Sequence, residues 1–183
     1  MNVGCVGCQR GDSVDDPFDL LGFSCHFKLD PKDVVQTQAR ALARCHPDRH
    51  PEGVERELAI MRSAQINAAA TILVDPLLRA EALIAILDPM GKAVPLAAAQ
   101  LMELLQQRES MEASTKSSLA ESQACKEWVR CEKQSTVDQL EILFSATPVD
   151  WFATRAAVAY LRAIVRLSNE LNRLLELGRT EIR

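Results

Sequence analysis

The sequence predicts an all-α protein. Aromatic residues make up only 4% of its 183 residues and glycines number 7, whereas Ala and Leu recur along the whole chain. This composition favours helices over sheets, because Ala and Leu are strong helix formers while strands are rich in aromatic and β-branched residues. A hydrophobic content of 48% in a chain of this length suffices for one or two small domains.

Charge and hydropathy exclude several classes of function. Lys and Arg total 21 against 25 Asp and Glu, a net charge of −4 without long runs of one sign, so neither nucleic-acid nor membrane binding is indicated. The longest apolar stretches, 83–87 and 156–161, are far shorter than the roughly 20 residues of a membrane helix. Residues 1–17 match neither a secretory signal nor an Arg-rich transit peptide. The dispersed cysteines therefore indicate a reducing compartment.

The chain begins with a Gly-containing arm, residues 1–17, that is expected to lack a core of its own. The segment Phe18-Asp19-Leu20-Leu21-Gly22 predicts a short helical turn closed by Gly. A longer helix should begin at Asp30-Pro31, with Asp30 as N-cap and Pro31 in the first position. Residues spaced by four and three predict its buried face: Val35, Ala39 and Leu42. The opposite face is basic and carries Lys32, Arg40 and Arg44.

Pro47 should end this helix, because proline lacks an N–H and disfavours the α conformation of the residue before it, His46. After a short loop, a second apolar stripe recurs at spacings of three and four: Leu58, Met61, Ala64, Ala68 and Ile72. Two helices joined by a short loop bury their stripes against each other. The tripeptide His46-Pro47-Asp48 should therefore lie at the exposed tip of an antiparallel hairpin, which a short helix over 77–87 extends.

Prolines and a glycine in residues 89–95 predict a linker to a second domain, residues 96–183. Three helical patterns follow, over 96–113, 117–144 and 150–177. The last pattern has a regular buried stripe: Val158, Leu161, Val165, Ser168, Leu171 and Leu175. A three-helix bundle is the economical fold for this half of the chain.

The order of a Phe18–Gly22 turn, a basic helix, His46-Pro47-Asp48 and a second helix resembles a J domain, the hairpin of DnaJ-type co-chaperones, over residues 18–88. Further segments resemble the HscB branch, which serves iron–sulfur cluster assembly. These segments are Ala64-Gln65-Ile66-Asn67-Ala68-Ala69, Leu73-Val74-Asp75-Pro76-Leu77-Leu78-Arg79-Ala80-Glu81 and Leu101-Met102-Glu103-Leu104-Leu105-Gln106-Gln107-Arg108-Glu109. The resemblance implies a J-domain hairpin followed by a three-helix bundle that binds a client.

The resemblance implies a co-chaperone rather than an enzyme, with no required cofactor. Its first partner would be a DnaK-type, HscA-like chaperone whose ATPase it activates by binding two chaperone states differently. Asp48 would accept charge-assisted hydrogen bonds from a chaperone Arg, Pro47 would fix the loop and His46 would add polar contacts. Docking charges would come from the basic residues Lys32, Arg40, Arg44 and Arg49. Alone, these cations are equally consistent with a solvated helix face.

The second partner implied by the resemblance is an IscU-type scaffold protein, bound by residues 96–183. Leu101, Leu105, Arg108 and Glu109 share one helix face, whereas Leu104 and Met111 fall on another. All these leucines could equally be core residues of a short bundle helix. Two departures from the family bear on the client contact: Gln106 stands where relatives often have an acid and Ala163 where they often have an aromatic residue. The contact is then expected to be weaker, or shared with neighbours: Met102, Tyr160 and Ile164.

The pair Cys5 and Cys8 has metal-ligand spacing but supplies only two ligands, whereas a closed zinc site needs four. It resembles one of the two cysteine pairs that precede the J domain in eukaryotic relatives. Completion by Cys25, completion by a second molecule, and free thiols are the alternatives. By resemblance, the compartment is the mitochondrial matrix if this arm is part of a eukaryotic extension, and the bacterial cytoplasm otherwise.

The sequence also allows rival functions. His46, Asp48 and His50 alternate along the chain and could form half of a metallohydrolase site, but further ligands are scarce and Pro47 places them on an exposed tip. A generic J-domain co-chaperone with a different client is the other alternative. A zinc-linked redox or iron-binding module led by Cys5 and Cys8 is a further class, but it leaves the other domains without a role.

Overall fold

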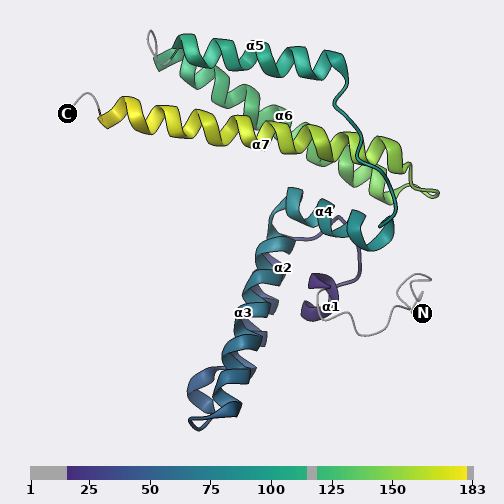
Figure 1. The fold of residues 1–183 in the computed structure, drawn as a ribbon, viewed down its shortest axis with the longest axis vertical. Coiled ribbons are helices and arrows are strands. Elements are labelled where there is room, and N and C mark those ends of the chain that lie inside the picture. Colours follow the sequence, from purple (N-terminus) through teal and green to yellow (C-terminus); the bar gives the residue numbers. More distant parts are fainter. Residues whose placement is uncertain (1–15, 115–118, 181–183) are drawn as a thin grey trace. The chain divides into compact units, whose positions relative to one another are not determined.

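A computed structural model describes residues 16–114 and 119–180 (Figure 1). These residues form seven α-helices and one short 3-10 helix, without a strand among them, which confirms the all-α prediction. They divide into two compact units, and the boundary in the sequence lies between Pro89 and Met90. No helix in the described ranges is long and apolar enough to cross a membrane.

The first unit begins with the short helix α1, Pro17–Leu21, which Gly22 closes as the sequence predicts and which Asp16 caps at its start. At its start, the Asp16 carboxylate accepts hydrogen bonds from the backbone N–H groups of Phe18 and Asp19, at 2.8 and 3.4 Å. At its end, Gly22 adopts a left-handed φ of 73°, a conformation that costs glycine nothing because it has no Cβ. The caps place Phe18 and Leu21 inward, where both are buried.

Helices α2, Pro31–Arg44, and α3, Val54–Val74, form the antiparallel hairpin, and α4, Pro76–Leu87, follows (Figure 1). Asp30 caps α2 by accepting the Lys32 N–H, and Asp75 caps α4 in the same way. The core of this unit is made of apolar side chains from all four helices and the loop after α1: Phe18, Leu21, Phe27, Val34, Ile66, Leu73, Leu77 and Leu83. Helix α1 contacts both arms of the hairpin, so the hairpin buries the side facing α1.

The predicted buried stripes of α2 and α3 are wrong by about one residue. On α2, Val34 is fully buried whereas Val35 is 53% exposed. On α3, Leu58 and Met61 are 58% and 61% exposed, and the buried row instead runs through three alanines and two larger residues: Ala59, Ile66, Ala69, Ala70 and Leu73. Both helices have two apolar rows at helical spacing, and periodicity does not distinguish them. The position of α1 and the close approach that alanine allows decide which row is buried.

Arg79 of α4 is a buried cation, only 5% exposed, that joins α4 to the segment before α2. Its guanidinium Nη1 donates to the carbonyl oxygens of Leu73, at 3.0 Å, and Leu29, at 3.4 Å. The guanidinium also lies 5.0 Å from the ring centroid of Phe27, a cation–π contact. Arg79 therefore satisfies a carbonyl in the last turn of α3 that would otherwise be buried without a partner.

We expect Arg79→Met to destabilise the first unit by about 2–4 kcal/mol, because the Leu73 carbonyl loses its donor while the apolar volume is largely kept. Urea unfolding followed by far-UV circular dichroism measures this effect. Arg62→Met, which removes an exposed arginine of α3, is the matched control and should change stability by less than about 0.5 kcal/mol. Equal effects of the two substitutions would contradict the proposed role of Arg79.

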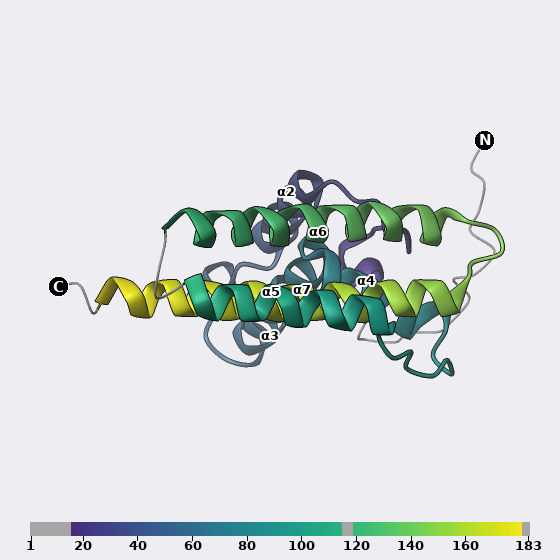
Figure 2. The same ribbon diagram turned by 90° about the horizontal axis from the view of Figure 1, so that it is seen from above.

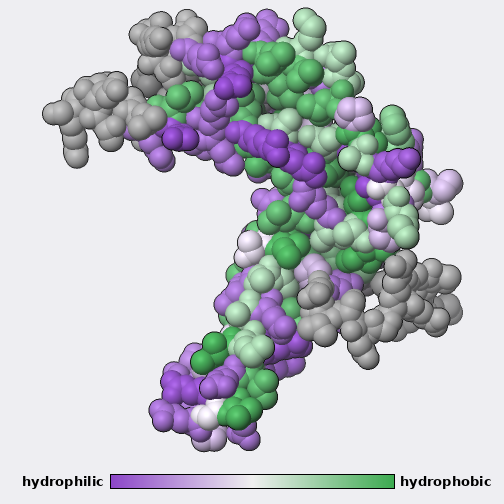
Figure 3. Space-filling view, in the orientation of Figure 1, coloured by the Kyte–Doolittle hydropathy of each residue, from purple (hydrophilic) through white to green (hydrophobic). Residues whose placement is uncertain are grey.

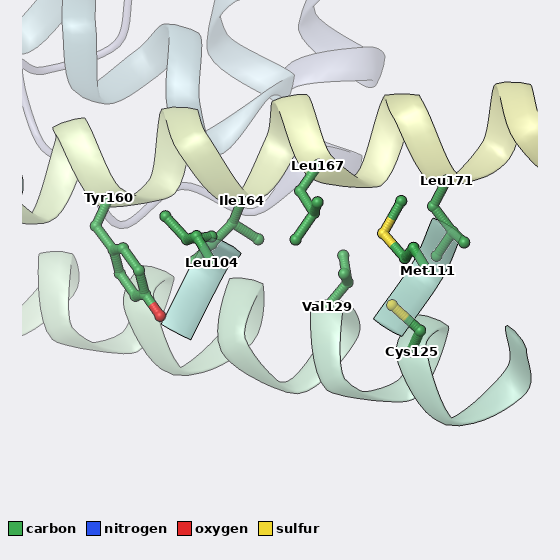
Figure 4. Packing of buried hydrophobic residues seen from close by; sticks show 8 residues of the cluster. All are labelled: Leu104, Met111, Cys125, Val129, Tyr160, Ile164, Leu167 and Leu171. Carbon is green, nitrogen blue, oxygen red and sulfur yellow. The ribbon is translucent and has the colours of Figure 1, made fainter. Parts of the chain in front are cut away.

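The second unit is a bundle of three helices: α5, Ala98–Ser114, α6, Leu119–Ser145, and α7, Trp151–Thr180. The three lie alongside one another, and α6 runs opposite to α5 and α7 (Figures 1 and 2). Figure 4 shows the core cluster between them, made of Leu104, Met111, Cys125, Val129, Tyr160, Ile164, Leu167 and Leu171. Of the stripe predicted for α7, Val158, Leu161 and Leu171 are buried, Val165 and Ser168 are half-buried, and the Leu175 side chain lies outside the described residues.

Tyr160, the only tyrosine of the chain, places a hydroxyl within this core. The hydroxyl donates to Glu132 Oε2 of α6 at 3.2 Å. Burial first, and then the negative charges of Glu132 and Glu103, raise the pKa of Tyr160 well above its ordinary value. The phenol is therefore held neutral where three helices meet.

We expect no tyrosinate absorbance from the folded protein at alkaline pH. Because the pKa of Tyr160 is higher in the folded than in the unfolded chain, the unfolded state loses its proton first. The titration of Tyr160 should therefore leave the free energy of unfolding constant below about pH 10 and lower it above that pH. An alkaline titration should show tyrosinate absorbance rising together with the loss of circular dichroism. Tyrosinate forming near pH 10 in a fully helical protein would contradict this expectation.

Candidate functional site

The tripeptide lies where α2 turns back into α3. Helix α2 ends at Arg44, Cys45 caps it, and the 3-10 turn η1, Pro47–Arg49, follows. His46 has an extended backbone, with φ −62° and ψ 127°, which is the conformation imposed on a residue that precedes proline. The turn therefore arises directly from Pro47, and it projects the two flanking side chains outward.

His46 and Asp48 contact each other through a hydrogen bond and a close approach of their side chains. The Asp48 backbone N–H donates to His46 Nδ1 at 3.3 Å, and Asp48 Oδ2 lies 3.6 Å from the same nitrogen. Because Nδ1 accepts this hydrogen bond, the neutral imidazole carries its proton on Nε2. The side chains remain 55% and 75% exposed, so the imidazole and the Asp48 carboxylate are open to a partner.

Two sets of hydrogen bonds hold the tip on the hairpin. Arg49 Nη1 donates to the Ala43 carbonyl at 2.9 Å, which satisfies an acceptor in the last turn of α2 and places a cation at its negative end. On α3, the Ser63 hydroxyl lies 2.8 Å from the Ala59 carbonyl and 3.4 Å from the Cys45 carbonyl. The start of the tripeptide is thus tied to both helices.

The basic side chains predicted for α2 form one row. Lys32, Gln36, Arg40 and Arg44 follow at intervals of four residues, and all four are exposed. Arg40 donates to Gln36 Oε1 at 3.2 Å, a bond that fixes its direction without neutralising it. Arg49 continues the positive charge to the tip. Of the seven residues predicted for the first site, five lie at or beside the tip: Arg44, His46, Pro47, Asp48 and Arg49. Arg40 lies one turn before Arg44, whereas Lys32 lies in the first turn of α2, about 18 Å along the helix from Arg44.

An exposed apolar row that the sequence analysis did not predict follows the tip. Val54, Leu58 and Met61, in the first two turns of α3, are 58–71% exposed close to the tip in the chain. The helical spacing predicts Leu58 and Met61 in the buried stripe, which is wrong. The second apolar row of α3, through Ala59 and Ile66, was the signal that one row had to remain outside.

The residues predicted to bind a client lie on the outside of α5. Leu101, Met102 and Leu105 are 47%, 71% and 50% exposed, whereas Leu104 is buried in the bundle core. Glu109 is also exposed. The interpretation of Leu101 and Leu105 as core residues is therefore wrong.

Arg108 is engaged within the bundle. Its Nη2 lies 3.2 Å from Glu170 Oε1 of α7, and its Nε lies 3.4 Å from Glu112 Oε1 of α5. Arg108 follows Leu105 by three residues and Leu101 by seven, so the ion pair also shows that the leucine face of α5 borders α7.

The expectation that Tyr160 and Ile164 share the client contact is wrong, because both side chains are buried in the bundle core (Figure 4). Ala163 is half-buried and packs against the same core. Gln106 is exposed on α5. The α7 side of the predicted client face therefore offers a methyl group where an aromatic side chain was expected from the resemblance.

The cysteines provide no described metal centre. Cys5 and Cys8 lie outside the described residues. Cys25 and Cys45 are half-buried and outside any disulfide, Cys131 is exposed, and burial raises the pKa of Cys125. Within 16–114 and 119–180, no three His, Cys, Asp or Glu side chains are placed to hold a metal ion, and this includes the tip with His46, Asp48 and His50.

No family model matches the chain, but the similar proteins of known sequence and structure all carry the same name. The co-chaperone protein HscB homolog of Vibrio cholerae strain N16961 is 31% identical over 170 residues, which cover 86% of this chain and 95% of the relative. The homolog of Haemophilus influenzae is 30% identical over 169 residues, covering 88% and 95%. The match to the homolog of Bordetella parapertussis is 40% identical but spans 70 residues, only 41% of that relative.

Solved structures share the fold. The chaperone HscB from Vibrio cholerae superposes with a TM-score of 0.76 at 28% identity, over 89% of this chain and 99% of that one. Human HscB superposes with the same TM-score at 18% identity, over 94% and 88%, which shows the fold alone. A helical hairpin with an exposed tip followed by a three-helix unit is thus the architecture of a co-chaperone. The chain belongs to the HscB co-chaperone family.

Proposed function

We propose that this protein stimulates the ATPase of a DnaK-type, HscA-like chaperone and delivers an IscU-type iron–sulfur scaffold protein to it. The observation that carries the proposal is the His46-Pro47-Asp48 tip, exposed at the end of the hairpin beside a row of cations. Side chains as exposed as those of His46 and Asp48 fit binding to a partner better than chemistry on a small substrate, which is usually enclosed in a pocket. The protein then acts as an activator and not as an enzyme.

The chemistry of the tip supports recognition of an arginine-bearing surface. The Asp48 carboxylate is 75% exposed and accepts charge-assisted hydrogen bonds, which are about twice as strong as neutral ones. The His46 imidazole directs its Nε2 proton outward, because Nδ1 is occupied by the Asp48 N–H. A partner with a guanidinium and a nearby acceptor would match both groups.

The row on α2 supports electrostatic docking on an acidic surface. Three unneutralised cations in one row raise the association rate with an oppositely charged partner, and such steering weakens with added salt. The exposed Leu58 and Met61 on α3 would add apolar contact near the tip once the charges have docked. Activation itself requires that these contacts differ between two states of the chaperone.

The face of α5 supports the client assignment. Leu101, Met102 and Leu105 form a row of large apolar side chains that the bundle leaves outside, which is typical of the centre of a protein interface. One chain would carry both the bound client and the activating tip. Once one of them has bound the chaperone, binding of the other is nearly intramolecular. Stimulation should therefore be larger with the scaffold present than without it.

A steady-state ATPase assay of the chaperone, with this protein and scaffold added separately and together, tests the proposal. We expect stimulation by this protein alone and more than additive stimulation by both. Stimulation without a scaffold effect would favour a co-chaperone with a different client, and no stimulation would overturn the proposal. Zinc binding by Cys5 and Cys8 stays a prediction. Residence in the mitochondrial matrix also stays a prediction, and the relatives similar in sequence from Vibrio, Haemophilus and Bordetella are bacterial.

A further inference from the structure

Helix α7 carries a row of arginines that neither the tip nor the α5 face uses. Its members follow at spacings of seven, four and seven residues: Arg155, Arg162, Arg166 and Arg173. At 100° per residue these positions fall within about 40° of one another around the helix axis, along about 27 Å of its length. Arg162, Arg166 and Arg173 are exposed and Arg155 is half-buried.

The row adjoins the leucine face of α5. Glu170 follows Arg166 by four residues and precedes Arg173 by three, so it is a neighbour of both on the helix surface. The Glu170 carboxylate lies 3.2 Å from Arg108 Nη2, across the boundary between α7 and α5. Arg108 in turn lies on the same face of α5 as Leu105. The Arg108–Glu170 ion pair therefore places Arg166 and Arg173 next to the face of α5 that carries Leu101 and Leu105.

On α7, this border carries two exposed cations. Glu170 and Glu112 are both engaged by Arg108, which leaves Arg166 and Arg173 as the exposed charges beside Glu170 on α7. A surface with an apolar centre and a cationic edge is complementary to a partner whose apolar patch is edged by carboxylates. Because Ala163 contributes only a methyl group to this side of α7, charge is the main contact that α7 has to offer there.

We propose that Arg166 and Arg173 extend the client-binding face of α5 onto α7 and contact carboxylates on the scaffold protein. The inference rests on the proposed function, because the occupant of the face is the scaffold client. It adds a specificity determinant: the client patch is apolar in its centre and acidic on the side that meets α7. The contacts lie at the edge of the interface, where charges act on association rate and salt dependence more than on residence time.

Titration calorimetry of the full-length double variant Arg166→Gln, Arg173→Gln against the scaffold tests the inference. We expect Kd to rise about three- to tenfold at low ionic strength and by less than about twofold at 0.5 M salt, where exposed charges are screened. The matched control is Lys126→Gln, Arg130→Gln, which removes the same two positive charges from exposed positions on α6. The control should bind like the unaltered protein.

Equal affinities of the arginine variant and the control would overturn the inference, as would a loss of affinity that persists at high salt. Leu101→Ala, Leu105→Ala distinguishes the two levels of failure. If the leucine variant loses scaffold binding while the arginine variant does not, the face on α5 stands and its extension onto α7 is wrong. If the unaltered chain does not bind the scaffold, the proposed function fails and the inference fails with it.

Discussion

Replacing Asp48 by Asn is expected to remove stimulation of the chaperone ATPase almost completely while leaving the protein folded. The substitution keeps the volume and the acceptor oxygen of the side chain but removes the charge on which a charge-assisted bond to arginine depends. Losing a charged partner from a desolvated contact costs about 2–5 kcal/mol, which corresponds to a fall of roughly 30-fold or more in productive docking. The measurement is single-turnover ATP hydrolysis by the chaperone over a range of co-chaperone concentrations.

The structure predicts that this variant keeps its stability. The Asp48 side chain is 75% exposed, and the bond to His46 Nδ1 comes from the backbone N–H, which the substitution retains. Asp33→Asn removes an exposed carboxylate from α2 with the same change in charge and serves as the control. Stimulation by the Asp48 variant equal to that of the control would exclude the tip as the activating group.

Replacing Leu101 and Leu105 together by Ala should weaken scaffold binding about 100-fold. Both side chains are about half exposed in the free protein, and completing their burial in an interface is worth about 1–2 kcal/mol each. Two such contacts correspond to about two orders of magnitude in Kd. Titration calorimetry measures the affinity, and circular dichroism should show unchanged helicity.

Leu104 provides the matched control, since it is the same residue type on the same helix but points into the bundle core (Figure 4). Leu104→Ala should lower the free energy of unfolding by about 2–5 kcal/mol and leave the affinity of the folded protein nearly unchanged. Should Leu101→Ala, Leu105→Ala lower stability instead and bind the scaffold normally, these leucines would be structural and the client face would lie elsewhere.

Local features of the hairpin could be predicted from sequence because each depends on a few neighbouring residues. Gly22 closes α1, Asp30 caps α2, and Pro47 ends the basic helix at the expected place. Such effects act over one helical turn, through the hydrogen bonds of chain ends and the fixed φ of proline. The exposed tripeptide follows from the same local rules, because a loop between two antiparallel helices lies at their tip.

The choice of buried face on each helix required the tertiary structure. Val34 and Val35 are equivalent by periodicity, and so are the rows of Ala59 and Leu58 on α3, until α1 packs on one side of the hairpin. The same holds for the predicted client face, where Arg108 of α5 is paired with Glu170, 62 positions further along the chain. Sequence alone determined where helices begin and end and which motif they display. Tertiary structure decided which faces remain for partners, because burial depends on contacts between residues that are distant in the chain.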